Sequence, residues 1–114
     1  MSKTNHGTTV VTVGDEEYTL NFTLKAVRAI EGRFGGLVPA LQELGKANIN
    51  AIATIVLIGS GAEFKRKDVE QMEEAIFDCG IGEANQQVIK YISDLLNPQA
   101  RKAEELEKAA EGNE

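Results

Sequence analysis

The chain contains few of the residues that build metal sites and catalytic sites. Its 114 residues include one cysteine, one histidine and no tryptophan. A zinc site needs several cysteine or histidine ligands, and a Cys–His nucleophile pair needs the two side chains in contact. His6 lies in a polar N-terminal stretch and Cys79 falls on an apolar helical stripe, so we expect a structural thiol. With one cysteine no intrachain disulfide can form, which fits a reducing compartment.

Phosphate-binding loops and catalytic carboxylates are also missing from the sequence. The segment IGSG at residues 58–61 lacks the third glycine of a dinucleotide fingerprint, and no Gly-Lys-Ser or Gly-Lys-Thr occurs. We interpret this segment as a helix stop and a turn. The acids within residues 15–17 and 70–74 are interpreted as solvated, and a surface or capping role is favoured for Glu31. The sequence therefore predicts a protein without enzymatic activity and without a bound cofactor.

Charge and hydrophobicity restrict the classes of partner. The formal net charge of -6 disfavours binding to nucleic acid and to anionic lipid. The longest apolar run, residues 51–59, is about half of what a membrane-spanning helix needs, and residues 1–9 lack the apolar core of a signal peptide. The basic run at residues 65–67 has acidic neighbours and reads as a solvated loop. We expect a soluble, cytoplasmic protein.

A β-hairpin is predicted near the N-terminus. Residues 8–13 are rich in Thr and Val, and residues 18–22 alternate apolar with polar side chains, with a polar turn at residues 14–17 between them. A hairpin alone is marginal in water, so we expect it to pack on helices. Its predicted apolar face consists of Val11, Val13, Tyr18, Leu20 and Phe22.

Two helices are predicted after the hairpin. Thr23 can cap the first, whose apolar residues recur at helical spacing over residues 24–34 before Gly35 and Gly36 end it. The second spans residues 37–46, with Pro39 in its first turn, where a missing N–H costs little.

The next element, residues 51–58, is apolar on all sides and should be buried on several faces. Its β-branched content also suits a strand, and periodicity alone does not decide between the two. We favour a central helix, which Asn48 or Asn50 can begin.

Two further helices complete the predicted domain. Asp68 and Gln71 resemble a capping box at the start of one, which Gly80 ends. The last helix covers residues 83–96 and closes before Pro98.

These elements predict an α+β fold, with an N-terminal β-hairpin followed by a mostly α-helical bundle of four to five short helices. Residues 1–7 are expected to form a disordered lead-in, because they lack any periodicity. Residues 8–97 form a single globular domain. Residues 98–114 are rich in Ala, Glu and Lys with one Leu, and we expect a charged tail that is flexible or a frayed helix.

The order of these segments resembles a known family. A hairpin at residues 10–22 runs directly into TLKAVRAIE at residues 23–31, then FGG at residues 34–36, and later an apolar helix ends in IGSG at residues 58–61. This pattern is similar to that of the tail-assembly chaperones of gene transfer agents, prophages and tailed phages. The resemblance covers residues 10–96 and consists of apolar patterns and glycines.

The resemblance implies a role in phage tail morphogenesis. Members of this family bind the tape-measure protein, a long helical chain with exposed apolar surface, and keep it soluble until tail-tube subunits polymerise around it. It implies the tape-measure protein as partner, the tail-tube protein as a further candidate, and a site of action in the cytoplasm of a bacterial host. It also implies that the protein is absent from mature particles. Self-association of the chain stays open.

Two helical stripes are the candidates for partner binding, although each also fits ordinary core packing. Two other functions stay open: a structural subunit of the tail or head–tail junction, and a helical adaptor or regulator unrelated to phage. The candidate partner-binding residues are Leu37, Leu41, Leu44, Val88, Ile92 and Leu95.

Overall fold

The computed structural model describes residues 7–61 and 63–97. It consists of a two-stranded antiparallel hairpin followed by five helices, which confirms the predicted α+β fold. The expected tail at residues 98–114 and most of the expected lead-in lie outside the described residues. Gly7 was assigned to that lead-in, but its carbonyl accepts a hydrogen bond of 3.1 Å from the Phe22 N–H and extends the hairpin by one pair.

The hairpin pairs strand β1 (Thr8–Val13) with strand β2 (Glu16–Asn21). Its turn is shorter than predicted, because Val13 already pairs with Glu16. Gly14 supplies the positive φ, 64°, at the first central position of this two-residue turn, where a type II′ hairpin turn needs glycine. The predicted apolar face is confirmed, with Tyr18 half-buried and the other four side chains buried.

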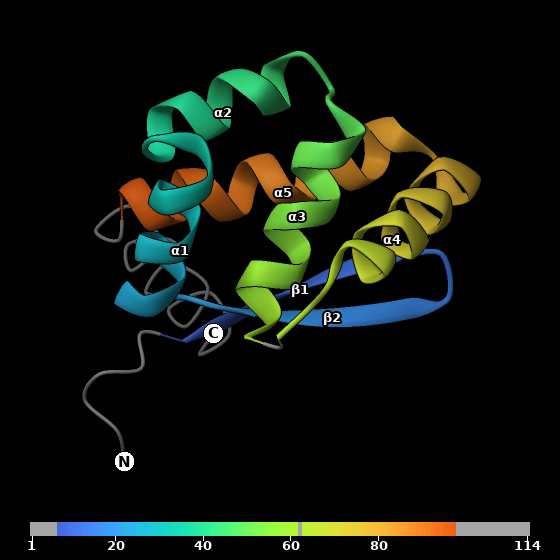
Figure 1. Cartoon of the computed structure of the whole chain (residues 1–114), viewed down its shortest axis with the longest axis horizontal. Helices are drawn as coiled ribbons and strands as arrows, with labels where there is room; N and C mark the ends of the chain where they lie inside the picture. The colour runs from blue at the N-terminus through green and yellow to red at the C-terminus, as the bar shows by residue number, and fades with distance from the viewer. Residues whose placement is uncertain (1–6, 62, 98–114) are drawn as a thin grey trace, which may run out of the picture.

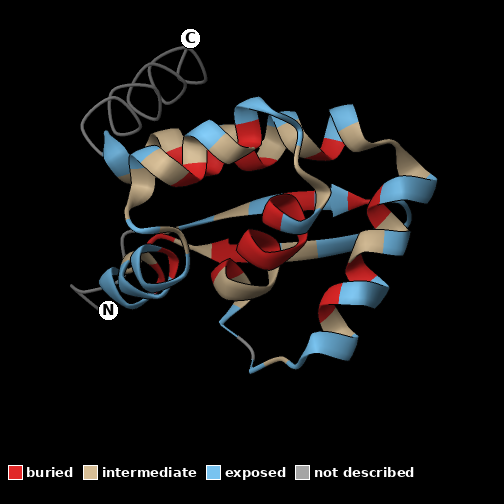
Figure 2. Ribbon diagram, turned by 45° about the horizontal axis from the view of Figure 1, so that its top comes forward, coloured by how far each residue is buried: buried red, intermediate tan, exposed pale blue. Residues whose placement is uncertain are grey.

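The five helices surround one core. Helix α3 packs on β2 and α5 packs on β1, while α1 and α4 stand at opposite ends of the molecule (Figure 1). The buried residues lie mainly where the helices and the hairpin face one another (Figure 2). The helices are α1 (Leu24–Phe34), α2 (Leu37–Gly45), α3 (Ile49–Ser60), α4 (Arg66–Cys79) and α5 (Ile81–Leu96).

The run at residues 51–58 is helical, as favoured from the sequence. Asn48 caps α3, because its Oδ1 accepts from the N–H groups of Asn50 and Ala51 at 3.0 and 3.2 Å. All six residues from 51 to 56 are buried, which fits a helix that contacts the hairpin on one side and other helices around it. The helix continues through Gly59 to Ser60 and Gly61 is its C-cap, so the stop predicted at residues 59–61 is confirmed at the end of that segment.

Helix α4 begins earlier than predicted. Asp68 was expected to cap it, but the N-cap is Lys65, and Asp68 occupies the third helical position. From there its carboxylate accepts from the Lys65 backbone N–H at 2.8 Å, which is the acidic half of a capping box. Arg66 and Lys67 are exposed, as expected, but they form the first turn of a helix and not a loop.

Helices α4 and α5 follow each other almost without a connection. Gly80 ends α4, as predicted, and at the same time serves as the N-cap residue of α5. Helix α5 therefore begins at Ile81, about one half-turn before the predicted start near Glu83. The bend at Gly80 turns α5 back under α2 and across the hairpin.

Candidate protein-binding surfaces

The two predicted partner-binding stripes face each other. Helices α2 and α5 run antiparallel, because the Asn85 Nδ2 near the start of α5 donates to the Leu44 carbonyl near the end of α2, at 2.8 Å. The apolar sides of the two helices therefore contact each other and the core below.

This packing corrects half of the predicted site. Leu44, Val88 and Ile92 are fully buried and belong to the core, so they have no surface to offer a partner. In each helix the most deeply buried side chains of the stripe pack into the chain's own core, as is usual for amphipathic helices. Leu37, Leu41 and Leu95 are only half-buried.

The half-buried residues continue into exposed ones along the same two helices. Val38, in the first turn of α2, keeps 55% of its surface exposed, and Leu96, at the end of α5, keeps 38%. Both were predicted as helical residues but not as partner-binding residues, because sequence spacing alone does not reveal how far the α2–α5 contact extends. We define the α2–α5 seam as Leu37, Val38, Leu41, Ile89, Leu95 and Leu96.

A second surface is a groove between α1 and the C-terminal end of α3. Its volume is about 440 Å³. We call it the α1–α3 groove; its lining includes Ala26, Ala29, Ile58, Gly59 and Phe64. At one end the Asn21 Nδ2 donates to the Gly59 carbonyl at 3.0 Å, which fixes the end of β2 against α3.

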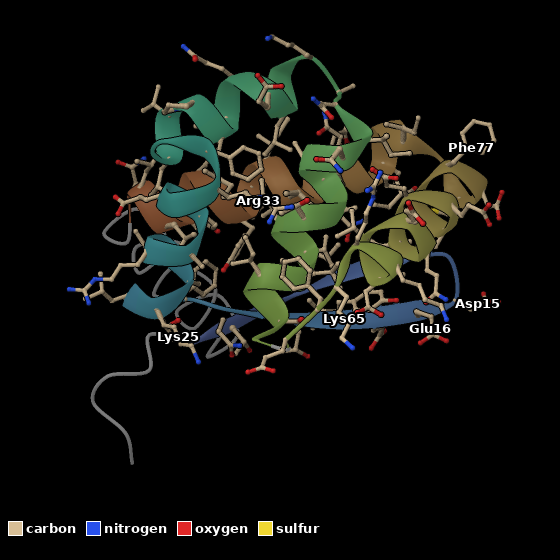
Figure 3. The ribbon with its side chains drawn as sticks, viewed as in Figure 1. Asp15, Glu16, Lys25, Arg33, Lys65 and Phe77 are labelled. Carbon is tan, nitrogen blue, oxygen red and sulfur yellow. The ribbon has the colours of Figure 1, made fainter. Side chains whose placement is uncertain are left out.

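One cation lines this groove on the α1 side. It is Lys25, and a second cation, Arg33, lies eight residues further along the same helix. Both side chains are exposed, and among the described residues neither has a carboxylate within 4.0 Å. Figure 3 shows Lys25 at one end of the molecule.

The opposite end carries an exposed aromatic residue and acids. Phe77, near the end of α4, keeps 70% of its surface exposed, the largest fraction among the exposed large apolar residues. The hairpin turn with Asp15 and Glu16 lies at the same end (Figure 3). Glu70 and Glu74 precede Phe77 by two turns and one turn of α4, and both are exposed.

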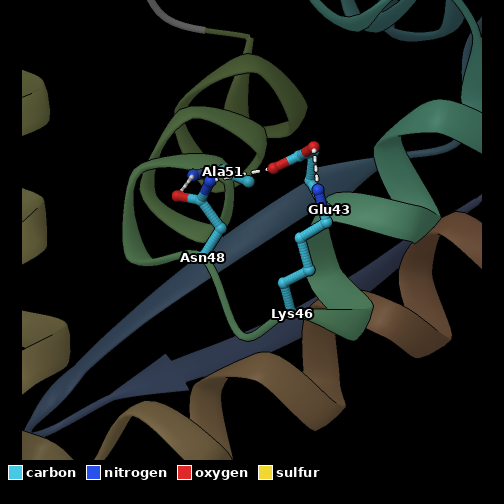
Figure 4. A network of polar contacts seen from close by, with 4 residues as sticks. All are labelled: Glu43, Lys46, Asn48 and Ala51. Atoms are coloured by element: carbon cyan, nitrogen blue, oxygen red, sulfur yellow. Dashed lines mark hydrogen bonds and ion pairs between the residues drawn. The ribbon is translucent and has the colours of Figure 1, made fainter.

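The shifted titratable groups have structural causes and do not form a catalytic set. Burial raises the pKa of Tyr91, whose hydroxyl donates to the Asn21 carbonyl at 2.6 Å. At the α2–α3 connection, hydrogen bonds from Asn48 and Lys46 lower the pKa of Glu43 (Figure 4). These contacts fasten β2 to α5 and α2 to α3.

The residues considered for chemistry stand apart from one another. Glu31 is exposed on α1, and the Cys79 thiol is half-buried and lies 3.6 Å from the Ile76 carbonyl. Within residues 7–61 and 63–97 no group of three or more His, Cys, Asp or Glu is placed to hold a metal ion. In the same part of the chain, no helix has both the length and the apolar character needed to cross a bilayer.

Comparison of the chain with protein-family models, with curated proteins and with solved structures gives no match.

Proposed function

We propose that this chain is a non-enzymatic tail-assembly chaperone that binds the tape-measure protein of a phage or prophage in the bacterial cytoplasm. We further propose that the client contact is the α2–α5 seam. The observation that carries the proposal is that two helices in contact with each other, α2 and α5, both carry aliphatic side chains that stay half-buried or exposed.

The geometry of the seam suits a helical client. Two antiparallel helices with apolar residues between them form a shallow trough into which a third amphipathic helix can lay its apolar side. The tape-measure protein is a long helical chain, so it would present such sides repeatedly. Because the seam contains only Leu, Val and Ile, it has no rigid aromatic anchor and can accept different registers.

The charge of the chain supports the same role. A protein that exposes apolar side chains to bind a client must itself stay soluble. The net charge of -6 opposes non-specific aggregation of the chain. The same negative charge disfavours contact with phosphate groups, so the proposed contact with the client is made by apolar surface.

Co-expression with the tape-measure protein of the same gene cluster tests this function. We expect the tape-measure protein to become soluble and to co-purify with this chain. Val38→Asp should reduce co-purification at least about tenfold, because a carboxylate then faces the apolar side of the client. The substitution itself is tolerable, since Val38 is exposed and lies in the first turn of α2, where an acid is favourable.

Leu24→Asp is the matched control. Leu24 is also exposed, at 60%, and also lies in the first turn of a helix, but that helix is α1 and the residue is outside the seam. It should leave co-purification unchanged. A tape-measure protein that stays insoluble and unbound beside the native chain would refute the chaperone function. Recovery of the chain at fixed stoichiometry from purified particles would instead support a structural tail subunit.

A further inference from the structure

We propose that the α1–α3 groove binds the Phe77 side chain of a second copy of this chain, in a head-to-tail contact. The inference concerns the chain alone and does not rest on the proposed function. It connects two features that the α2–α5 seam leaves unused: an apolar groove with a basic border, and an exposed aromatic residue with acidic neighbours.

Phe77 is exposed in a way that would let its ring insert into a groove on another molecule. It stands on the solvent side of α4 with 70% of its surface exposed. Its nearest charged neighbours on that helix are Glu74, one turn before it, and Asp78, which follows it; Glu70, a further turn away, is paired with Arg66 at 3.6 Å. Aromatic side chains supply large contact areas at interfaces, and the surrounding charges decide which surfaces they meet.

The groove has the size and lining that a phenyl ring needs. An apolar cavity of about 150 Å³ can hold benzene, and the groove offers about 440 Å³. Ala26 and Ala29 form the wall on α1, and Ile58 lies on α3. Phe64, on the connection between α3 and α4, can pair with the incoming ring edge to face.

The charges on the two surfaces are complementary in sign. Lys25 lines the groove, and Arg33 lies eight residues further along α1, about 12 Å along a helix. Glu74 and Asp78 precede and follow Phe77 on α4 and are exposed, whereas Glu70 is paired with Arg66 of the same helix at 3.6 Å. Glu63 is the one acid among the described residues that line the groove, and it is exposed.

The ring cannot come from the same molecule. Phe77 lies eleven residues beyond Arg66 on one continuous helix, about 16 Å along its axis. Phe64, at the groove, precedes the start of that helix, so α4 itself holds Phe77 away from its own groove. Only another copy can bring a Phe77 side chain to this position.

Such a contact joins two different surfaces and is therefore heterologous. After the first contact one copy keeps a free groove and the other keeps a free Phe77, so chains of copies or a closed ring result. The α2–α5 seam takes no part in the contact. Several seams would then be presented side by side on one assembly.

Sedimentation velocity of the purified full-length chain over a range of concentrations tests the contact. We expect the mean mass of the native chain to rise with concentration beyond that of a dimer. Phe77→Ser should weaken association at least about tenfold, because the main apolar anchor is lost. Val38→Ser removes another exposed apolar residue, 55% exposed, from the seam and should leave the association unchanged.

The charges are tested in the same way. Lys25→Glu should weaken association, and adding Glu74→Lys to the same chain should restore part of it. Raising the salt concentration should weaken association of the native chain, since exposed charge pairs are screened. A native chain that is monomeric at every concentration overturns the proposal, as does self-association that Phe77→Ser leaves intact.

Mixing two variants tests the head-to-tail geometry. Phe77→Ser keeps the groove, and Ala29→Glu fills the groove but keeps Phe77. Each alone should be monomeric, and their mixture should form 1:1 dimers that grow no further. If the mixture stays monomeric while both variants keep native circular dichroism and melting temperature, the contact is not the one proposed.

Discussion

At the scale of single residues, Tyr91 links the C-terminal helix to the hairpin. Its ring is buried and packs against Phe22 with centroids 5.4 Å apart. Its hydroxyl donates to the Asn21 carbonyl at the end of β2. Burial raises the pKa of Tyr91, because the charged phenolate is poorly solvated in the core.

This contact predicts a loss of stability at alkaline pH. The folded chain holds the Tyr91 proton more tightly than the unfolded chain, whose tyrosines titrate near a pKa of about 10. The contribution of the protonated Tyr91 hydroxyl to the free energy of unfolding is therefore complete below about pH 10 and is lost as the pH rises above it. Tyr91→Phe should lower the free energy of unfolding by about 1 kcal/mol at pH 7 and flatten its decline above pH 10. Urea unfolding at pH 7 to 11 measures both effects.

Tyr18→Phe is the control for this experiment. The pKa of Tyr18 is also raised, by partial burial and by the charge of Glu16. Tyr18 is only half-buried, so solvent screens its ionisation and the slope above pH 10 should change less. If Tyr91→Phe leaves the alkaline decline as steep as in the native chain, Tyr91 is not its source.

At the scale of elements, the contact between α3 and the hairpin depends on Gly59. A Cβ at this position would lie 3.1 Å from the Leu20 Cβ, from the Leu20 Cδ2 and from the Tyr91 hydroxyl. Leu20 and Tyr91 are themselves packed in the core. Gly59 therefore lets α3 lie directly on β2, and the sequence pattern had suggested only a helix stop here.

A pair of glycine substitutions tests that contact. Gly32→Ala, on the exposed side of α1 where a Cβ meets nothing within 4 Å, should raise the free energy of unfolding by about 0.5–1 kcal/mol through helix propensity. Gly59→Ala gains the same propensity but overpacks the core, so it should lower that free energy by about 1 kcal/mol. Equal stabilisation by both substitutions in chemical denaturation would contradict the packing.

The cap of α3 provides a third prediction. Asn48→Ala removes the acceptor for two backbone N–H groups and should cost about 1 kcal/mol. It also removes the strongest hydrogen bond that lowers the pKa of Glu43. The contribution of ionised Glu43 to the free energy of unfolding is present above its unfolded pKa and is lost as the pH falls through its folded pKa. Asn48→Ala should raise the folded pKa of Glu43, so this contribution should be lost at a higher pH. An NMR titration of the Glu43 carboxyl measures the shift, and an unchanged pKa would contradict it.

Local patterns predicted the type of the hairpin strands and of four helices, because capping residues and periodicity act within a few residues; for α3, helix was only favoured over strand. Thr23 and Asn48 cap helices where expected, and the alternation in the hairpin identified its buried side. The start of α4 was misplaced, because Asp68 can serve either as N-cap or at the third position. Only the backbone conformation at Lys65 distinguishes the two.

The candidate site was predictable only in part, because the exposure of a side chain depends on how neighbouring helices pack. Leu41 and Leu44 occupy the same helical stripe, but the approach of α5 buries Leu44 completely and leaves Leu41 half-covered. Which member of a stripe stays accessible depends on the distance and angle between helices. Likewise, nothing in the spacing of α4 marks Phe77 as exposed until the positions of its neighbours are known.

At the scale of the whole molecule, the surfaces proposed for binding are distinct. The seam lies along α2 and α5, the groove lies between α1 and α3, and Phe77 projects from the end of α4. A client could therefore occupy the seam while neighbouring copies contact each other. Because long clients have many apolar segments, such an arrangement would cover them with several weak contacts acting together.

The most direct measurement of the central claim is hydrogen–deuterium exchange of the chain, free and in complex with the tape-measure protein. Binding at the seam should slow exchange in α2 and in the second half of α5, since a docked helix limits their opening. Helix α4 should be less affected. Unchanged exchange in α2 and α5 in a complex of full occupancy would contradict the claim that the seam holds the client.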